Sequence, residues 1–320
     1  MLRTQAALCC RAGQRFIAHT IPARNFTIAI DGPAASGKSS TARAVAQELG
    51  FGYIDSGSIY RCATLLALRS GITDIGSRAN DLVDLINRSS IDIKFQSSSS
   101  RSAPNLITGR LTVPDMRILL NDEDVSDEIR KPDVNRMVAK VASDGGIRAA
   151  VLNVQRALAA AAETRSTQTQ SKDGIAKRIP GGVVMDGRDI GTTIFPKAEL
   201  KIYLDASAMA RAIRRWDEMN CRLKEEATRV KTATASNSAA GSGGGGAATE
   251  KAPAEYPSVE DIARELEERD YADINRQHSP LRIAADAVVI DNTSMTFEQQ
   301  VYTIADLARD RMGLEPKHDL

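Results

Sequence analysis

The segment that most constrains the fold is residues 28–40, which reads IAIDGPAASGKSS. It fits the pattern G-x-x-x-x-G-K-[ST] at every fixed position, between a short apolar run and the helix-forming stretch TARAVAQELG. In that context a strand leads into a glycine-rich turn, whose backbone N–H groups and following helix N-terminus bind phosphate. The alternative is a chance glycine turn before a helix, and the flanking strand and helix patterns argue against it. The segment therefore predicts a site for a nucleoside triphosphate.

The residues of this loop have distinct predicted roles. Lys38 can reach the β- and γ-phosphates, and the Ser39 hydroxyl can ligate Mg²⁺. Asp186, at the end of a later apolar run, either holds a water molecule on that Mg²⁺ or caps the turn that follows. The expected ATP-binding residues are Gly32, Pro33, Ala34, Ala35, Ser36, Gly37, Lys38, Ser39 and Ser40.

Composition limits the classes of protein that need to be considered. The chain has 320 residues, of which 42% are hydrophobic and 26% charged, as in an ordinary globular protein of one large or two smaller domains. No apolar run approaches the roughly 18 residues of a membrane span. Four arginines and no acid or lysine lie in residues 1–24, so subtracting them from the net charge of +1 leaves −3 for the rest. We therefore expect neither a membrane protein nor a general nucleic-acid binder.

The N-terminal segment 1–25 has the composition of an organelle transit peptide. It is rich in arginine, free of acids, and lacks the continuous apolar core of a secretory signal. We expect import into the mitochondrial matrix, with a plastid or the cytoplasm as alternatives; a disordered basic tail would have the same composition. Cys62 and Cys221, the two cysteines outside this segment, show no metal or disulfide pattern, in keeping with a reducing compartment.

Five short apolar runs separated by helical patterns predict an α/β fold, with a five-stranded parallel sheet flanked by helices. The runs are FTIAIDG, GYIDSG, GVVMDGRD, LKIYLDAS and AVVIDNT. Each ends in a polar residue or glycine, which places the chemistry at the carboxyl ends of the strands. Between residues 81 and 135 the patterns IDIKFQ, NLITGRLTV and RILLND alternate instead, which predicts a small antiparallel insertion. The polar stretch 164–181 and the Gly/Ser/Ala-rich tract at about 231–257 are expected to loop out.

Arginines recur beside the predicted strand ends and turns, where they could screen phosphate charge. Arg269, Asp273 and Arg276 are spaced i, i+4 and i+7, so one helix face would carry all three. That face is either a salt-bridge ladder or a charged clamp on the sugar and phosphate of a substrate. The other arginines of this kind are Arg61, Arg188, Arg211, Arg214 and Arg215.

Several motifs occur in an order that extends from residue 26 to 310. They are AIDGPAASGKSS, YIDSGSIYR, NDEDVSDEIR, IRAAVLNVQR, DGRDIGTTIFPKAELKIYLDAS and ERDYADINRQHSPLRIAADAVVIDNT. With these motifs the chain resembles the bacterial-type cytidylate kinases of the nucleoside monophosphate kinase superfamily. The resemblance implies a P-loop core at residues 26–80 and 146–310, a nucleoside monophosphate (NMP)-binding insertion at 81–145, and a lid region at 207–270 that contains the low-complexity tract.

The resemblance also implies a binding site for cytidine monophosphate (CMP). Arg148 and Asp189 would read the cytosine edge, because a guanidinium donates to O2 and N3 while a carboxylate accepts from the 4-amino group. The remaining implied CMP contacts are Asp55, Ser56, Arg61, Arg188 and Arg276 for the nucleotide and its phosphate, and Arg269 with Asp273 for the ribose. Residues implied in catalysis are Lys38, Arg188, Arg211 and Arg215, with Arg214 beside them at the lid.

One residue departs from the family pattern at the base site. Where the family usually has a serine that contacts cytosine, nine residues before Arg148, this chain has Ala139. A base contact is therefore missing or supplied elsewhere, which bears on the preference for CMP over UMP.

The expected reaction is transfer of the ATP γ-phosphate to CMP or dCMP by a monomer that uses Mg²⁺ as cofactor. Alternatives are a UMP/CMP kinase of relaxed base specificity, a kinase for shikimate or dephospho-CoA, and a catalytically degenerate nucleotide-binding protein. A guanine-reading switch would need an N-K-x-D sequence, which the chain lacks.

Overall fold

The computed structural model of the protein describes residues 26–95, 116–163, 181–221 and 257–318. The expected transit segment 1–25 and the pattern NLITGRLTV lie outside these residues. So do nearly all of the polar stretch 164–181 and of the tract at 231–257. The predicted domain boundaries stay predictions.

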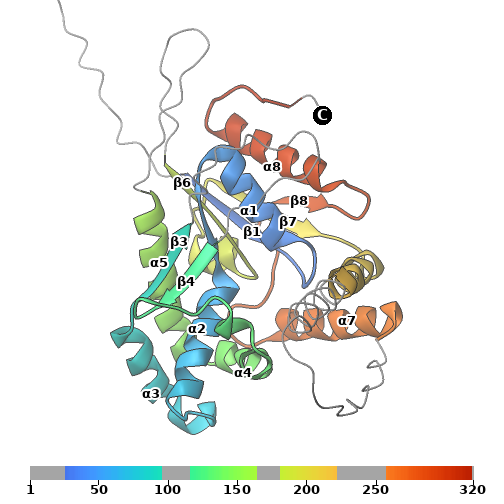
Figure 1. Ribbon diagram of the computed structural model, residues 1–320. Coiled ribbons are helices and arrows are strands. Elements are labelled where there is room, and N and C mark those ends of the chain that lie inside the picture. Colours follow the sequence, from blue (N-terminus) through green and yellow to red (C-terminus); the bar gives the residue numbers. More distant parts are fainter. Residues whose placement is uncertain (1–25, 96–115, 164–180, 222–256, 319–320) are drawn as a thin grey trace, which may run out of the picture.

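The centre of the molecule is a five-stranded sheet in the order β2-β6-β1-β7-β8, in which every neighbouring pair is parallel (Figure 1). The predicted fold class is confirmed, because each of the five apolar runs forms one strand. Their bounds are β1 (Phe26–Asp31), β2 (Gly52–Asp55), β6 (Gly182–Gly187), β7 (Leu200–Asp205) and β8 (Val288–Asp291).

Helices cover both faces of this sheet. The chain passes from β1 to β2 in one direction along the sheet and returns from β2 to β6 in the other. Because both crossovers are right-handed, the helices of these two connections lie on opposite faces of the sheet. Helix α1 contacts β6 and α8, while α5 packs on β2 and β6. The helices are α1 (Lys38–Leu49), α2 (Ser56–Arg69), α3 (Ile75–Arg88), α4 (Pro132–Ser143), α5 (Gly145–Glu163), α7 (Val259–Asn275), α8 (Phe297–Arg311) and a helical segment described over residues 208–221. Single turns lie at η1 (Glu128–Arg130) and η2 (Ile190–Ile194).

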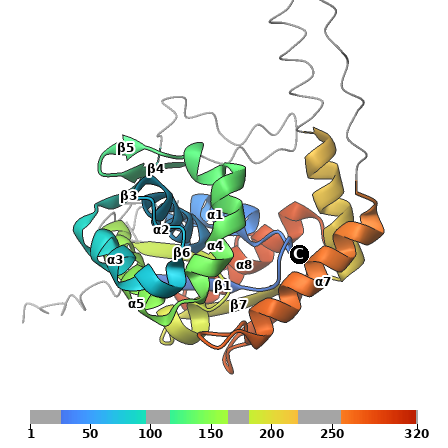
Figure 2. The same cartoon turned by 90° about the horizontal axis from the view of Figure 1, so that it is seen from below.

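The predicted antiparallel insertion is present as a second, three-stranded sheet. Strands β3 (Ile91–Phe95), β4 (Met116–Leu120) and β5 (Glu123–Asp124) pair in the order β3-β4-β5. The β4–β5 turn uses Asn121 and Asp122 at φ of 50° and 67°, the left-handed region that two-residue hairpins need. Figure 2 shows this sheet with α3 and α4 on one side of the molecule and α7 on the other.

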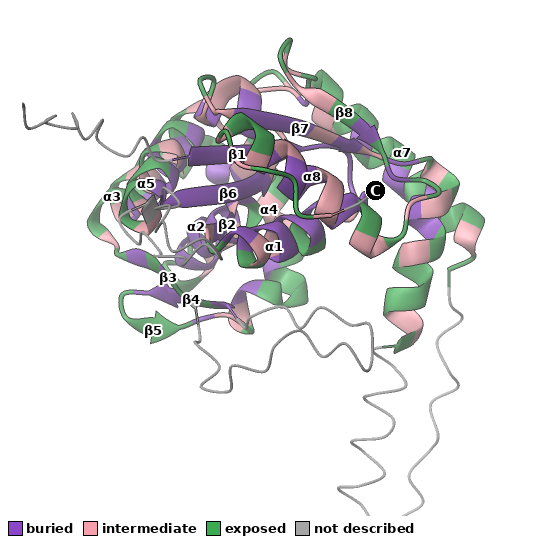
Figure 3. Ribbon diagram, turned by 90° about the horizontal axis from the view of Figure 1, so that it is seen from above, coloured by how far each residue is buried: buried purple, intermediate pink, exposed green. Residues whose placement is uncertain are grey.

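The core strands are apolar almost throughout and reach the sheet's carboxyl edge with buried polar residues. Every residue of β1 is buried (Figure 3). Asp31, the last residue of β1, and Asp186, the last but one of β6, are buried as well. Because the strands are parallel, these carboxylates meet at one edge of the sheet, next to the start of α1. That edge holds the site described next. Among the described helices none combines the length and the apolar character needed to cross a bilayer.

Candidate active site

The loop between β1 and α1 has the conformation that its glycines predict. Gly32 has φ of 153°, and a Cβ there would lie 2.1 Å from the backbone oxygen of Leu204, so no side chain fits. Gly37 adopts φ of 84° immediately before α1. With no side chain capping that helix, its first N–H groups are left for a ligand, as at other phosphate-binding helix termini.

Lys38 is buried and turned back onto its own loop. Its Nζ donates to the backbone oxygen of Pro33 and, at 3.3 Å, to Oγ of Ser36. Burial, followed by the positive charge of Arg188, lowers the pKa of Lys38 well below its ordinary value. A bound phosphate anion would oppose both effects and favour the charged ammonium.

Ser39 and Asp186 meet at the carboxyl edge of the sheet. Ser39 Oγ donates to Asp186 Oδ2 at 2.6 Å, and the Tyr53 hydroxyl donates to Oδ1 at 2.8 Å. Burial, and then the nearby Asp55 carboxylate, raises the pKa of Asp186 to about 6. The two Asp186 oxygens accept from the hydroxyls of Ser39 and Tyr53 and not from the turn that follows β6. This geometry is compatible with the predicted role of Asp186 beside a Mg²⁺ ion, which stays a prediction.

Asp31 also belongs to this edge, although the sequence analysis gave it no role. Its two oxygens accept from the backbone N–H groups of Ile190 at 2.8 Å and Gly191 at 2.7 Å, which fixes η2 against β1. Burial raises the pKa of Asp31 to about 6 in spite of these bonds. The sequence feature that could have indicated a role for Asp31 is its position at the end of the apolar run that forms β1.

Arg148 and Asp189 form a buried ion pair, 2.6 Å from Nη2 to Oδ2. Arg148 Nη1 also donates to the Ala142 backbone oxygen at 3.0 Å, and the guanidinium stacks 5.3 Å from the ring centroid of Tyr60. Arg276 Nη2 lies 3.4 Å from the other Asp189 oxygen. Arg148 and Asp189, 41 positions apart in the sequence, thus place a hydrogen-bond donor and an acceptor side by side.

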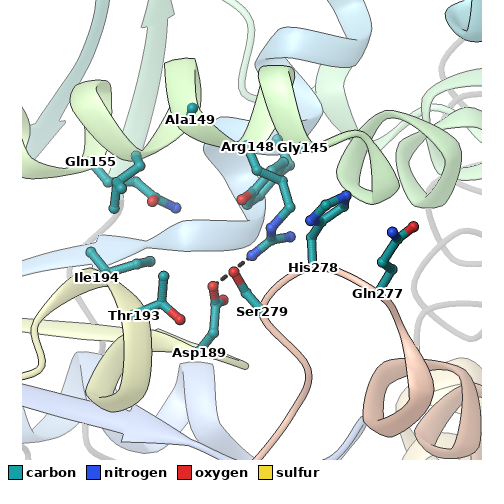
Figure 4. Close-up of a pocket in the computed structure, with 12 residues that line it drawn as sticks. Gly145, Arg148, Ala149, Gln155, Asp189, Thr193, Ile194, Gln277, His278 and Ser279 are labelled. Atoms are coloured by element: carbon teal, nitrogen blue, oxygen red, sulfur yellow. Dashed lines mark hydrogen bonds and ion pairs between the residues drawn. The ribbon is translucent and has the colours of Figure 1, made fainter.

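This ion pair lines a cavity of about 280 Å³. The cavity is lined by residues of α2, of α5, of η2 with the residue before it, and of the turn after α7. Figure 4 shows how the labelled side chains from the last three of these converge. The sequence analysis singled out Arg148 and Asp189 but missed the other polar side chains that line this cavity. They are Tyr60, Gln155, Thr193, Gln277, His278 and Ser279.

Further arginines gather beside this cavity. Arg188 Nε donates to Asp273 Oδ2 at 2.7 Å. Burial and then Arg188 lower the pKa of Arg269, and Arg61 and Arg215 add to the effect. Arg188 follows Asp186, the partner of Ser39 at the loop between β1 and α1 (the P-loop), by two residues and directly precedes Asp189 of the cavity, so it lies between the P-loop and the cavity. The structure therefore brings the predicted phosphate ligands together.

The predicted lid arginines are arranged differently from one another. Arg211 is buried and donates to the Ala34 backbone oxygen at 2.9 Å and to Asp270 at 2.6 Å, so its guanidinium binds the P-loop in this structure. Arg214 binds both the side chain and the backbone oxygen of Asn292. Arg215 is exposed.

Two further predicted CMP contacts, Asp55 and Ser56, lie at the start of α2, and Ala139, which replaces the family's serine, lies on α4. Asp55 caps α2 by accepting from Ser58 N at 3.2 Å. Ser56 Oγ is bound by Gln155 Nε2 at 2.8 Å. Ala139 is exposed on α4 and does not line the cavity around Arg148.

Known proteins provide a comparison for this geometry. The family model for cytidylate kinase matches residues 28–233 and 248–310, leaving a gap inside the Gly/Ser/Ala-rich tract. The chain belongs to the cytidylate kinase family. A cytidylate kinase of Leuconostoc mesenteroides is 34% identical over 290 residues, covering 90% of this chain and 99% of its own. Those of Pelodictyon phaeoclathratiforme and Geobacillus kaustophilus are each 35% identical, over 90% and 91% of this chain and 96% and 99% of their own.

Family membership fits the two halves of the site. A P-loop with Lys38 and Ser39 forms one half, and the cavity around Arg148 and Asp189 forms the other. Arg188 lies between them.

Proposed function

We infer that this member of the cytidylate kinase family transfers the γ-phosphate of ATP to CMP and dCMP, giving ADP with CDP or dCDP. The observation that carries the inference is the buried Arg148–Asp189 pair, which lines a cavity and whose Asp189 lies three residues along the chain from Asp186, the partner of Ser39. Arginine donors suit N3 and O2 of cytosine, and a carboxylate oxygen suits its 4-amino group.

The reaction needs no protein base. The attacking oxygen belongs to the acceptor phosphate, which is largely ionised at neutral pH, and it displaces ADP from the γ-phosphorus. What the chain must supply is positioning and positive charge, because two polyanions approach each other. Lys38 on the donor side, Arg61 and Arg276 on the acceptor side and Arg188 between them are proposed to supply that charge. Arg269 and Asp273 are proposed to hold the ribose.

Mg²⁺ is the proposed cofactor, and the oxygen donors at the P-loop fit it. Ser39 Oγ and the Asp186 carboxylate are 2.6 Å apart, and hard oxygen ligands of this kind suit Mg²⁺, which otherwise keeps water and substrate phosphate ligands. Ser39 would bind the ion directly and Asp186 would hold one of its waters. When bound, Mg²⁺ neutralises charge on the β- and γ-phosphates.

The test is to follow the phosphoryl group itself. The full chain is incubated with γ-labelled ATP, Mg²⁺ and CMP, and the products are separated. The proposal expects label in CDP and little in free phosphate. An Arg148→Met variant, which removes the donors to the base, should lower label in CDP by roughly 100-fold at subsaturating CMP. Label that appears only as free phosphate would make the protein an ATPase and contradict the proposal.

Residues 1–25 are proposed to direct the protein to the mitochondrial matrix, on the strength of their arginine content and their lack of acids. The protein is further proposed to act there as a monomer. Fusion of residues 1–25 to a fluorescent protein tests import, with Arg3, Arg11, Arg15 and Arg24 changed to Gln as the control. Light scattering of the full chain tests the monomer, which has a mass of 34.5 kDa.

A further inference from the structure

Gln155 is a buried side chain with half of its amide unsatisfied. It lies on α5 with 0% of its surface exposed. Its Nε2 donates to Ser56 Oγ at 2.8 Å, whereas Oε1 has no hydrogen-bond partner within the described part of the chain. A buried carbonyl oxygen without a donor is destabilising, so such atoms in folded proteins usually await water or a ligand.

The unsatisfied oxygen belongs to a residue that lines the Arg148–Asp189 cavity. Arg148, Leu152 and Gln155 are spaced i, i+4 and i+7 on α5, so all three lie on one helix face. All three line the cavity. In Figure 4 the Gln155 side chain extends from α5 toward the space shared with Arg148 and Asp189.

Two of the residues that line the cavity carry hydrogen-bond acceptors. They are Asp189, through its carboxylate, and Gln155, through its unsatisfied amide oxygen. The 4-amino group of cytosine carries two hydrogens and can donate to two acceptors at once. Uracil has a carbonyl oxygen at that position, which would face two acceptors and gain no hydrogen bond from either.

We propose that Gln155 is a residue that reads the nucleobase: its Oε1 accepts a hydrogen bond from the exocyclic amino group of CMP, while Ser56 holds the amide in that orientation. The inference rests on the proposed function, since it assigns a contact to the acceptor of that reaction. It also supplies a base contact in a chain that has Ala139 on the exposed side of α4.

The test compares Gln155→Leu with the wild-type chain on three acceptors: CMP, UMP, and the pyrimidin-2-one ribonucleoside monophosphate that lacks the 4-amino group. Leucine keeps most of the volume and removes the amide. We expect kcat/KM for CMP to fall about tenfold and that for the deamino analogue to change less than about twofold. The ratio of kcat/KM for CMP to that for UMP should fall about tenfold.

Two further variants serve as controls for this test. Gln155→Glu retains an acceptor oxygen and should keep the CMP:UMP ratio within about threefold of wild type, which gives an answer if the leucine variant does not fold. Gln300→Leu removes another buried amide, whose oxygen already accepts from Asn292 at 2.6 Å, and should leave the ratio unchanged.

The outcomes distinguish a failure of the role given to Gln155 from a failure of the proposed kinase activity. Equal losses on all three acceptors in Gln155→Leu would make Gln155 a packing residue and overturn the inference, as would a Gln155→Glu variant that prefers UMP. Failure of the wild-type chain to phosphorylate CMP at all would instead overturn the proposed function, and the inference with it.

Discussion

Arg211 and Asp270 form a buried ion pair, 2.6 Å from Nη1 to Oδ2, and together they bind both backbone polar groups of one P-loop residue, Ala34. Arg211 Nη1 donates to the Ala34 oxygen, and the Ala34 N–H donates to Asp270 Oδ1, each at 2.9 Å. The pair therefore connects the helical segment 208–221 and α7 to the loop between β1 and α1. Arg211, which the family resemblance implied in catalysis, binds the P-loop backbone in this structure.

Asp270→Asn tests this arrangement. It leaves the Arg211 charge buried without its carboxylate, so we expect the free energy of unfolding to fall by about 3–5 kcal/mol and KM for ATP to rise several-fold. Urea unfolding and steady-state kinetics measure the two effects. Arg78→Ala, which removes an exposed pair with Asp81, is the control and should change stability by less than about 1 kcal/mol. Similar small effects of both variants would refute a structural role for Asp270.

Lys38→Met should abolish transfer while the fold persists. The phosphates lose their central cation, so kcat should fall by roughly 10³-fold or more. Burial already lowers the pKa of Lys38, so removing the amine should cost little stability, within about 1 kcal/mol at pH 7.5. Single-turnover kinetics measure the loss of phosphoryl transfer, and thermal unfolding measures the change in stability. Turnover near the wild-type rate would contradict the role given to Lys38.

The raised pKa of Asp31, about 6, predicts a specific pH dependence of stability. Between its unfolded value near 3.8 and about 6, the folded state binds more protons than the unfolded state, so the Asp31 contribution to stability declines as pH rises. An asparagine has no such dependence. Relative to wild type, Asp31→Asn should therefore gain roughly 2–3 kcal/mol between pH 4 and pH 7 in urea unfolding. Parallel stability curves for the two proteins would contradict the raised pKa.

Ala139→Ser should have little effect on base selection. Ala139 lies exposed on α4 and away from the cavity that holds Arg148, so a hydroxyl there should change the CMP:UMP ratio by less than about threefold. The ratio of kcat/KM values measures this directly. A tenfold rise in CMP preference would mean that α4 moves onto the base during turnover.

The sequence predicts the sheet and the phosphate loop because their signals are local. Five apolar runs with polar ends, and glycines at fixed spacing before a lysine, specify strands and a turn without reference to the rest of the chain. Arg148 and Asp189 were assigned through family resemblance, because nothing in their local sequence indicates that they meet at 2.6 Å.

The residues that sequence reasoning missed owe their roles to tertiary contacts. Gln155 shares a helix face with Arg148 and Leu152, and nothing in its local sequence indicates that its side-chain oxygen lacks a partner beside the cavity. Asp270 follows Arg269 in a charged helix, where an ordinary solvated acid would look the same. Its contact with Ala34 spans 236 positions, a separation that local patterns do not encode.

The most direct measurement is ADP release by the full chain with Mg²⁺ and ATP, compared for CMP, dCMP, UMP, AMP and no acceptor. We predict fast release with CMP and dCMP, at least tenfold slower release with UMP and AMP, and almost none without an acceptor. ADP release that does not depend on the acceptor, or that is equally fast with every acceptor, would contradict the assignment of the Arg148–Asp189 cavity to cytosine.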